Sequence, residues 1–497
     1  MKYLSKKNHP LLVPIILLLL LGACKKNTGG GNPPPVPDPP PPVGTSVSIS
    51  VDKAVKYQTI QGFGFFGGHD VWWANAANVW NEAWGEKVIT DLGITMWRNE
   101  MYPPSTPTVT QDADWAKQKP VVEGLKTIAN RNNVNLKFLA TVWSPPADLK
   151  WTATLTWAGD LAATRGPGPV STRNGGTLNP NKYPEYADWL KANIQLYKNS
   201  GIDLYGLSLQ NELMFSQPFN SCIYTSAWFN QMVNGVVPLV KATFPNLKIF
   251  GAENMLDMEG KDNNWPVFYH SGIKANATTA GLIDVLAVHG YSDGVAASSG
   301  SELSKMWTNH AAQFTTPMNK EGWMTETSGY MDSWESSAGK PGAINLAMDM
   351  HSGLYYGNMS AWVWWQGSGG VSGEIGEFEL MKGTTTGKKY AASKHFYRYI
   401  RPGAVRVKTT SDNATVFVTA YENIAKGTHT IVIINNGDAK AITLNGTGLP
   451  ASYKMYRSSA VAAENCSLIG DVSTGGTNKI NVPAKSIVTL QAGGDAL

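Results

Sequence analysis

Eight short apolar segments recur along the middle of the chain and alternate with segments of helical periodicity. The apolar segments are Thr59–Phe65, Gly93–Trp97, Leu136–Trp143, Leu204–Leu209, Leu247–Gly251, Asp284–Val288, Trp323–Thr325 and Ala361–Trp365. Several are continuous hydrophobic runs, the pattern of parallel strands that are buried on both faces. In one intervening segment Tyr186, Leu190 and Ile194 share a helix face, and Gly201 is expected to end that helix. Eight β-α units over about 340 residues predict an α/β fold, a (β/α)8 TIM barrel with long loops.

The pattern changes after about residue 404, where short strands alternate between apolar and polar positions. They are Val416–Ala420, Thr430–Ile434, Ala441–Leu444, Lys454–Tyr456, Lys479–Val482 and Ile487–Gln491. This spacing predicts a small antiparallel β-sandwich side domain. Near the other end of the chain, Ser46–Val51 alternates like an edge strand, and we expect it to join that side domain.

The first 45 residues have the composition of an export signal followed by a spacer. Three lysines precede the apolar run Leu11–Leu21, which is too short to span a membrane comfortably, and Leu21-Gly22-Ala23-Cys24 then resembles the bacterial lipoprotein lipobox. This resemblance implies cleavage before Cys24 and acylation of its side chain; an ordinary secretory signal that contains a cysteine is the alternative. The Gly- and Pro-rich stretch that follows cannot form a packed core and indicates an extended tether.

The predicted organisation therefore has five parts, which are a signal peptide (1–23), a linker (24–45), an N-terminal strand (46–58), the catalytic barrel (59–403) and the side domain (404–497). We expect an exported bacterial lipoprotein that is held at a membrane only through its lipid anchor. The periplasmic face and the cell surface both remain open.

Composition excludes several classes of protein. The chain has 41 Lys and Arg against 37 Asp and Glu, and cleavage of the signal removes three lysines and no acid, so little of the formal charge of +4 belongs to the folded body. The sequence contains no stripe of Lys and Arg residues of the kind that binds nucleic acid. Cys222 and Cys466 lie far apart in the sequence, and two buried thiols are favoured over a bridge. The surplus that remains is aromatic, with 18 Trp and 19 Tyr.

Two carboxylates follow predicted strands on opposite sides of the barrel. Strand four ends in Gln210-Asn211-Glu212, and strand seven ends in Thr325-Glu326. Residues just past the C-terminal ends of the strands form the active site of a TIM barrel. Hydrolysis of a glycosidic bond uses one carboxyl to protonate the leaving oxygen and a second to attack or stabilise the anomeric carbon. A single Glu at a strand end is more often an ion-pair partner, but the pair favours catalysis.

Several ordered motifs resemble glycoside hydrolase family 30, and the resemblance covers nearly everything after the linker. The motifs are Gln61-Gly62-Phe63-Gly64, Trp143-Ser144-Pro145-Pro146, Gln210-Asn211-Glu212, His289-Gly290-Tyr291, Trp323-Met324-Thr325-Glu326, Trp362-Val363-Trp364-Trp365, the passage 395–404 and Val482-Pro483-Ala484-Lys485-Ser486. The resemblance implies a retaining enzyme with Glu212 as general acid/base and Glu326 as nucleophile. Retention predicts that the two carboxyls lie about 5–5.5 Å apart.

The remaining candidates have weaker support, each with a structural alternative. The other residues expected in the substrate site are Asn211 (a ring hydroxyl), Trp143 and Trp365 (walls that stack on sugar rings), His289, and Trp72 and His69 in the loop after strand one. Two more are expected to act on the nucleophile: Arg98 matches a position where related barrels hold it ionised with a cation, and Tyr291 is expected to hydrogen-bond it. A plain ion pair is the alternative for Arg98, and core packing is the alternative for the aromatic residues. For His69 the alternative is a role in fixing its loop.

The body is closest to the xylan-cleaving branch, because Asn179-Pro180-Asn181-Lys182-Tyr183 precedes the fourth strand as it does there. The loop at 366–374 lacks the Arg with which glucuronoxylan-specific members bind a carboxylate. We therefore expect an endo-β-1,4-xylanase that does not depend strictly on glucuronate side chains. The alternatives are an endo-β-1,6-glucanase or galactanase and, in another class, a non-catalytic polysaccharide-binding lipoprotein. No cofactor and no metal are expected, since no histidine lies in a metal-ligand spacing, and a monomer is expected.

Overall fold

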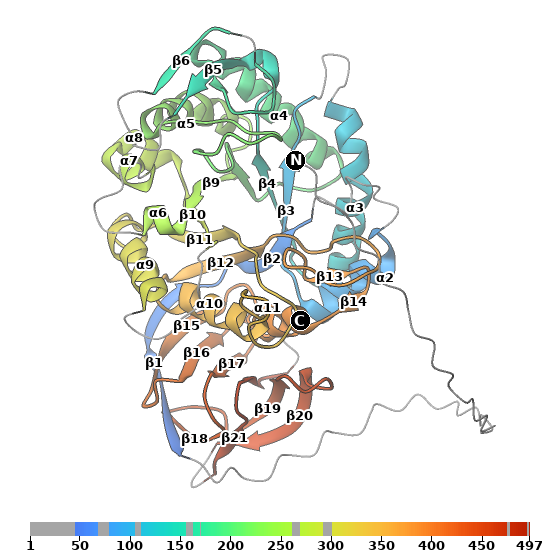
Figure 1. Cartoon of the computed structure of the whole chain (residues 1–497), viewed down its shortest axis with the longest axis vertical. Coiled ribbons are helices and arrows are strands. Elements are labelled where there is room, and N and C mark those ends of the chain that lie inside the picture. Colours follow the sequence, from blue (N-terminus) through green and yellow to red (C-terminus); the bar gives the residue numbers. More distant parts are fainter. Residues whose placement is uncertain are drawn as a thin grey trace, which may run out of the picture. The chain divides into compact units, whose positions relative to one another are not determined.

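The computed structural model describes residues 45–67, 79–104, 111–155, 163–168, 170–260, 269–291, 301–474, 478–494 and 497 (Figure 1). The signal, Cys24 and nearly all of the linker lie outside these residues, as do His69 and Trp72. In the described part of the chain no helix combines the length and apolar character needed to cross a membrane.

Eight parallel strands close into a barrel, which confirms the predicted TIM fold. Around the barrel the order is β10, β11, β12, β2, β3, β4, β8, β9, so the ring follows the chain order of the strands. Their bounds are β2 Gly62–Phe66, β3 Met96–Met101, β4 Lys137–Val142, β8 Gly206–Ser208, β9 Lys248–Met255, β10 Val285–His289, β11 Glu321–Glu326 and β12 Met359–Trp364.

Helices connect the barrel strands and cover the barrel, as Figure 1 shows. Their bounds are α2 Glu82–Glu86, α3 Gln111–Arg131, α4 Tyr183–Asn199, α5 Ser226–Lys241, α6 Leu256–Glu259, α7 Tyr269–Ala275, α8 Ala277–Leu282, α9 Glu302–His310, α10 Ala343–Tyr355 and α11 Lys388–Tyr397. Helix α4 shows why the pattern predicted them, because Tyr186, Leu190 and Ile194 are all buried on its inner face. Gly201, at φ 70°, follows the helix in the left-handed conformation that glycine adopts without a steric penalty.

Large side chains fill the inside of the barrel. Met96, Leu139, Phe250 and Trp323 form a buried cluster there with several smaller residues. The Trp323 ring packs against Phe250, with 5.5 Å between ring centroids. The inside of the barrel is therefore a packed core rather than a pore. A substrate can bind only at the rim of the barrel.

The side domain is a nine-stranded sheet with the order β20, β19, β22, β17, β16, β15, β1, β18, β21. Its bounds are β1 Ser46–Thr59, β15 Val405–Ser411, β16 Val416–Asn423, β17 Thr428–Asn435, β18 Lys440–Asn445, β19 Ser452–Ser458, β20 Asn465–Ser473, β21 Ile480–Val482 and β22 Ser486–Ala492. Strands β15 and β20 were not among the expected strands, although Val405-Arg406-Val407-Lys408 in β15 alternates between apolar and polar residues; in β20, Gly470 and Asp471 weaken the strand pattern.

The N-terminal strand β1 belongs to this sheet, but the expectation of an edge strand was wrong. It pairs antiparallel with β15 and parallel with β18, so both of its edges are hydrogen-bonded (Figure 1). The alternation along 46–51 reports which side chains face the core. It contains no information about whether a second strand covers the outer edge.

Short strands outside the barrel form two small antiparallel sheets. They are β5 Lys150–Thr154 with β6 Thr164–Gly166 and β7 Thr177–Leu178, and β13 Met381–Lys382 with β14 Thr385–Thr386. Between barrel and side domain, His395 of α11 hydrogen-bonds Thr489 and Ser458, both at 2.8 Å. Cys222 and Cys466 are free and buried, as expected.

Candidate active site

A cleft of about 770 Å³ opens where the barrel strands end. Its walls come from segments that follow six of the eight strands. The lining residues are Glu100, Tyr102, Pro103, Lys117, Trp143, Thr172, Arg173, Asn211, Glu212, Phe219, Asn220, Tyr291, Glu326, Trp365 and Phe378. Concave sites of this size with a few convergent polar groups are typical of ligand binding.

The two glutamates from strands four and seven meet in this cleft. Oxygen atoms of Glu212 and Glu326 lie within 4.8 Å of each other and of a His289 nitrogen. Glu326 is the last residue of β11 and is nearly buried, with 6% of its side chain exposed, whereas the Glu212 side chain is 16% exposed. This short separation fits the geometry of retaining enzymes, in which one carboxylate attacks the sugar directly.

Arg98 lies beneath the glutamates in the middle of β3. Its guanidinium donates to Glu326 Oε2 at 2.6 Å, to Asn211 Oδ1 at 2.9 Å and to Glu253 Oε1 at 3.1 Å. Its side chain has no exposed surface. It therefore positions Glu326 and Asn211, and the ion pair with Glu326 is the contact expected of a cation that keeps the nucleophile ionised.

Glu253, near the end of β9, is a functional residue that the sequence did not reveal. It is completely buried, and its carboxylate forms ion pairs with Arg98 and, at 3.6 Å, with His289 Nε2. Burial alone would raise the pKa of Glu253, but Arg98 and His289 lower it to about 2. In the sequence Glu253 is a single acidic residue at the end of an apolar strand, which by itself does not indicate a function. Only the fold shows that Arg98 and His289 are its partners.

His289 ends β10 and links the three carboxylates. Its Nδ1 lies 3.0 Å from Glu212 Oε1 and 3.9 Å from Glu326 Oε1. Burial lowers the pKa of His289, but Glu326, Glu212 and Glu253 outweigh burial and raise it to about 9, so the ring is an imidazolium at neutral pH. The side chain has no exposed surface. Like Arg98, it holds carboxylates in place and does not contact the substrate, contrary to expectation.

Tyr291 follows β10, and its hydroxyl donates to Glu326 Oε1 at 2.7 Å, the contact expected from sequence. The pKa of Glu326 is raised, chiefly by burial and also by the nearby Glu212, while His289, Arg98 and the Tyr291 hydrogen bond act against that rise. Glu326 thus receives hydrogen bonds on both oxygens, from Arg98 and from Tyr291. These fix the orientation of the carboxylate and favour its charged form.

Tyr291→Phe is expected to lower kcat/KM about tenfold at neutral pH, since a hydrogen bond to a charged group contributes about 1.5 kcal/mol or more. Loss of the donor raises the pKa of Glu326, so the acidic limb of the kcat/KM profile should move to higher pH. The measurement is kcat/KM against pH for the variant and for Tyr57→Phe, a control at an exposed tyrosine in β1. An unchanged acidic limb in Tyr291→Phe would show that the hydroxyl does not act on the nucleophile.

Aromatic rings form one wall of the cleft. Trp365 follows β12 and stacks on Phe66, with 4.3 Å between ring centroids and 14° between ring planes, and Trp143 lies 5.9 Å from Trp365. The Arg98 guanidinium lies 4.8 Å from the Trp143 ring. Trp143 and Trp365 both line the cleft, as expected for walls that cover the C–H face of a sugar ring. Phe66, the last residue of β2, thus supports Trp365 from below the cleft wall.

Polar groups in the cleft include one expected residue and two cations that were missed. Asn211 directs its side-chain oxygen to Arg98, which leaves its amide N–H groups for the cleft. Lys117 of α3 and Arg173, which precedes β7, also line the cleft, although neither follows a barrel strand directly. Their positions within a helix and a long loop carry no sequence signal that marks them as cleft residues. Trp72 and His69 lie outside the described residues and stay predictions.

Glu212, His289 and Glu326 are the group of side chains within the described ranges whose atoms are close enough to surround a metal ion. However, the Arg98 guanidinium already contacts Glu326 at 2.6 Å, and His289 is positively charged. Two fixed cations would repel a metal cation at this position. The arrangement suits proton transfer and nucleophilic attack better than metal binding.

A closed parallel barrel whose fourth and seventh strands bring two carboxylates within 4.8 Å, beside an aromatic wall, defines a retaining glycoside hydrolase. Residues 403–490 match the model of the glycosyl hydrolase family 30 beta sandwich domain. The chain is 25% identical over 422 residues to the glucuronoxylanase XynC of Bacillus subtilis (strain 168), covering 83% of this chain and 82% of that protein. The side domain is thus similar to that of glycoside hydrolase family 30, and most of the chain is similar to a glucuronoxylanase.

Solved structures share the fold. A family 30 endoxylanase from Clostridium papyrosolvens C71 aligns with 90% of this chain and all of its own at a TM-score of 0.68 and 22% identity. An endo-β-1,6-glucanase aligns with 91% of this chain and 94% of its own at a TM-score of 0.69 and 19% identity. At these identities the likeness concerns the fold alone, and it includes enzymes named for different linkages.

Proposed function

We propose that this protein is an endo-β-1,4-xylanase that works by double displacement and does not depend strictly on glucuronate side chains. The observation on which the mechanism rests is the approach of Glu212 and Glu326 within 4.8 Å, with Glu326 held by Arg98 and Tyr291. The choice of xylan rests on the curated relative, which is a glucuronoxylanase.

In the first step the Glu326 carboxylate attacks the anomeric carbon while Glu212 transfers its proton to the leaving oxygen, and a glycosyl-enzyme ester forms. In the second step Glu212, now a carboxylate, removes a proton from water as the water attacks the same carbon. The sugar leaves with its original configuration, and Glu212 is protonated again. The more exposed position of Glu212 suits contact with water and leaving groups.

The buried charges support this division of roles. Arg98 and His289 are two cations, and Glu253 and Glu326 are two anions, so the network is balanced when Glu212 is protonated. When Glu326 becomes an ester, it loses its charge and Glu212 gains one. The balance is therefore the same in both states, which avoids the cost of an unpaired buried charge.

The loop after β12 supports independence from a glucuronate carboxylate. Within its described residues Glu379 pairs with Lys382 at 2.8 Å, Glu377 pairs with Lys340, and the segment presents the half-exposed Phe378 to the cleft. The cations that line the cleft, Lys117 and Arg173, come from other segments. A carboxylate on the substrate could be accepted near them without being required.

The test is the product profile on glucuronoxylan, linear xylan and β-1,6-glucan at equal mass concentration. We expect oligosaccharides from both xylans, with kcat/KM values within about tenfold of each other, because loss of one exposed ion pair changes binding by about 1 kcal/mol or less. Cleavage of glucuronoxylan alone would refute the proposed independence. Cleavage of β-1,6-glucan alone would favour the alternative linkage, and binding without cleavage would favour the non-catalytic class.

We further propose that Cys24 is acylated and that the enzyme is a membrane-anchored lipoprotein. The support is the sequence around Cys24 and the Gly- and Pro-rich stretch after it, which suits a tether. Metabolic labelling with a radioactive fatty acid should mark the wild type and not Cys24→Ser. Equal labelling of both would disprove the assignment.

A further inference from the structure

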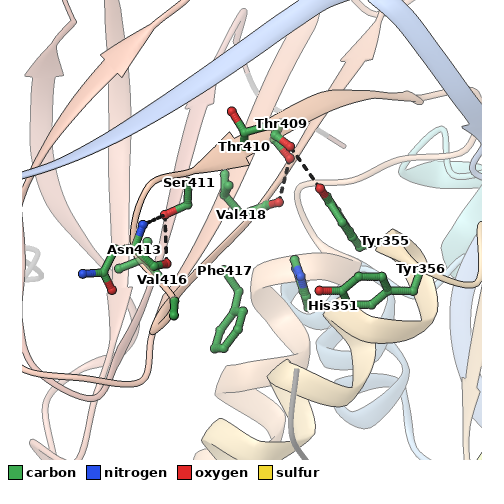
Figure 2. Close-up of a pocket in the computed structure, with 11 residues that line it drawn as sticks. His351, Tyr355, Tyr356, Thr409, Thr410, Ser411, Asn413, Val416, Phe417 and Val418 are labelled. Carbon is green, nitrogen blue, oxygen red and sulfur yellow. Dashed lines mark hydrogen bonds between the residues drawn. The ribbon is translucent and has the colours of Figure 1, made fainter. Parts of the chain in front are cut away.

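A second cavity, of about 310 Å³, lies between helix α10 and strands β15 and β16 of the side domain. It shares no lining residue with the catalytic cleft. Figure 2 shows the aromatic side chains gathered on one side of the cavity and the turn between β15 and β16 on the other. Its lining residues are His351, Tyr355, Tyr356, Thr409, Thr410, Ser411, Asn413, Ala414, Val416, Phe417 and Val418. The volume is at the lower end of the range for ligand sites, about 300–1,000 Å³.

The aromatic side is built around His351. Its ring stacks on Tyr355, with centroids 5.1 Å apart and planes 16° apart, meets Tyr356 edge-on at 6.2 Å, and lies 5.6 Å from Phe417. Tyr355, Tyr356 and Phe417 are each only partly buried, so faces or edges of their rings remain available to a ligand. Flat apolar surfaces of this kind cover the C–H face of a sugar ring.

His351 itself has unused hydrogen-bonding capacity. It is 97% buried, since only 3% of the residue is exposed, yet its imidazole makes no hydrogen bond to any described residue, and none of the dashed bonds in Figure 2 reaches it. Burial lowers the pKa of His351 to about 3, with Arg406 acting in the same direction, so the ring is neutral at working pH. A neutral imidazole offers one donor and one acceptor, and a hydroxyl group of a ligand in the cavity could bond to them.

The opposite side offers short polar groups and no net charge. Thr410 is exposed, and Ser411 and Asn413 form a hydrogen-bonded turn in which the Asn413 oxygen accepts from Thr415, leaving its amide N–H groups for a ligand. None of the residues that line the cavity is an acid, a lysine or an arginine. Asp412 lies within the turn, but its carboxylate accepts from the Ser48 backbone at 2.9 Å. The cavity therefore suits a neutral ligand with both an apolar face and hydroxyl groups.

We propose that this cavity is a second polysaccharide site that binds one neutral sugar ring of the substrate chain through the aromatic faces and His351. The inference rests on the proposed function for the identity of the sugar, a xylose unit. Because the end of α10 leads into the start of β12, the cavity lies away from the strand ends that form the cleft, and it would keep a long polymer close to the enzyme while other parts of that polymer enter the cleft. The second site would therefore lower the KM for polymeric substrates and would not change the KM for short oligosaccharides.

The test uses Glu326→Gln, which cannot turn over substrate, and titrates it with xylohexaose by calorimetry. Two binding sites are expected in Glu326→Gln and one in the double variant with His351→Phe, because phenylalanine keeps the ring packing and removes both nitrogens. Ala414→Arg is a second blocking variant at an exposed position of the turn, where folding is not at risk. In the active enzyme both changes should raise KM on polymeric xylan about tenfold and leave kcat/KM on xylohexaose unchanged.

The outcomes separate this inference from the proposed function. If the enzyme hydrolyses xylan but Glu326→Gln shows one site, or two sites that neither variant weakens, the second site is overturned and the proposed function stands. If Glu326→Gln binds no xylohexaose, the xylan assignment fails, and the same titration is made with a β-1,6-linked glucohexaose. In that titration, two binding sites in Glu326→Gln and one site in the double variant with His351→Phe would support the cavity as a sugar-binding site. Any other result would overturn it.

Discussion

Glu326→Gln is expected to reduce hydrolysis by more than about 10⁴-fold while polysaccharide binding is retained. The amide has the same shape as the carboxylate but cannot attack the anomeric carbon, and it carries no charge to stabilise a developing oxocarbenium ion. The aromatic wall of Trp143 and Trp365 is untouched, so affinity for the substrate should stay within a few-fold. Initial rates on the cleaved polysaccharide and retention in affinity gels measure the two effects.

The matched control is Glu335→Gln, the same chemical change at an exposed glutamate away from the cleft. It should behave as the wild type. A fluorinated activated glycoside that accumulates the glycosyl-enzyme should add its mass to the peptide containing Glu326. Full activity of Glu326→Gln, or label on another residue, would contradict the assignment of the nucleophile.

Glu212→Ala is expected to lower kcat/KM on polysaccharide by about 10²–10⁴-fold, the range that general acid catalysis supplies. On an aryl glycoside whose leaving group needs no proton, formation of the glycosyl-enzyme should be much less affected. The second step then lacks its base, so the intermediate should accumulate and show burst kinetics. Azide, which needs no base, should restore turnover and yield a β-glycosyl azide.

The stereochemistry of that azide distinguishes the two glutamates. Removal of the nucleophile would open the opposite face of the sugar, and Glu326→Ala with azide should yield the α-product. The control Glu123→Ala removes a carboxylate from α3 that forms only an exposed ion pair with Lys119, and it should need no rescue. An α-glycosyl azide from Glu212→Ala would show that Glu212 is the nucleophile and would contradict its assignment as acid/base.

The elements predicted from periodicity include all eight barrel strands, because a parallel strand buried on both faces requires an apolar run whatever its neighbours are. Strand β15 was not predicted, although Val405-Arg406-Val407-Lys408 alternates between apolar and polar residues. Arg406 in that strand is buried, but its guanidinium is paired with Gln58 and Asn358 and lies 3.9 Å from the centroid of the Tyr57 ring. An arginine in a sequence is normally assigned to the surface. Its burial can be explained only by its partners, which lie more than 40 positions away in the chain.

The catalytic pair could be named from the sequence because each glutamate directly follows a strand, and strand ends meet at one rim of a barrel. The resemblance also indicated that Arg98 holds the nucleophile ionised, but no such role was assigned to His289. Only the fold shows that both side chains are fully buried against Glu253 and contact carboxylates. Burial depends on what packs over a residue, and that is a property of the whole barrel.

The sequence alone determined the class of fold, the two glutamates at its rim and the aromatic character of the site, because these follow from local patterns and from the order of the strands. Only the tertiary structure decided the 4.8 Å approach of Glu212 and Glu326, the balance of buried charge around them and the neutral cavity around His351. Distances, electrostatic energies and desolvation depend on atoms from distant segments. No local pattern of side chains contains that information.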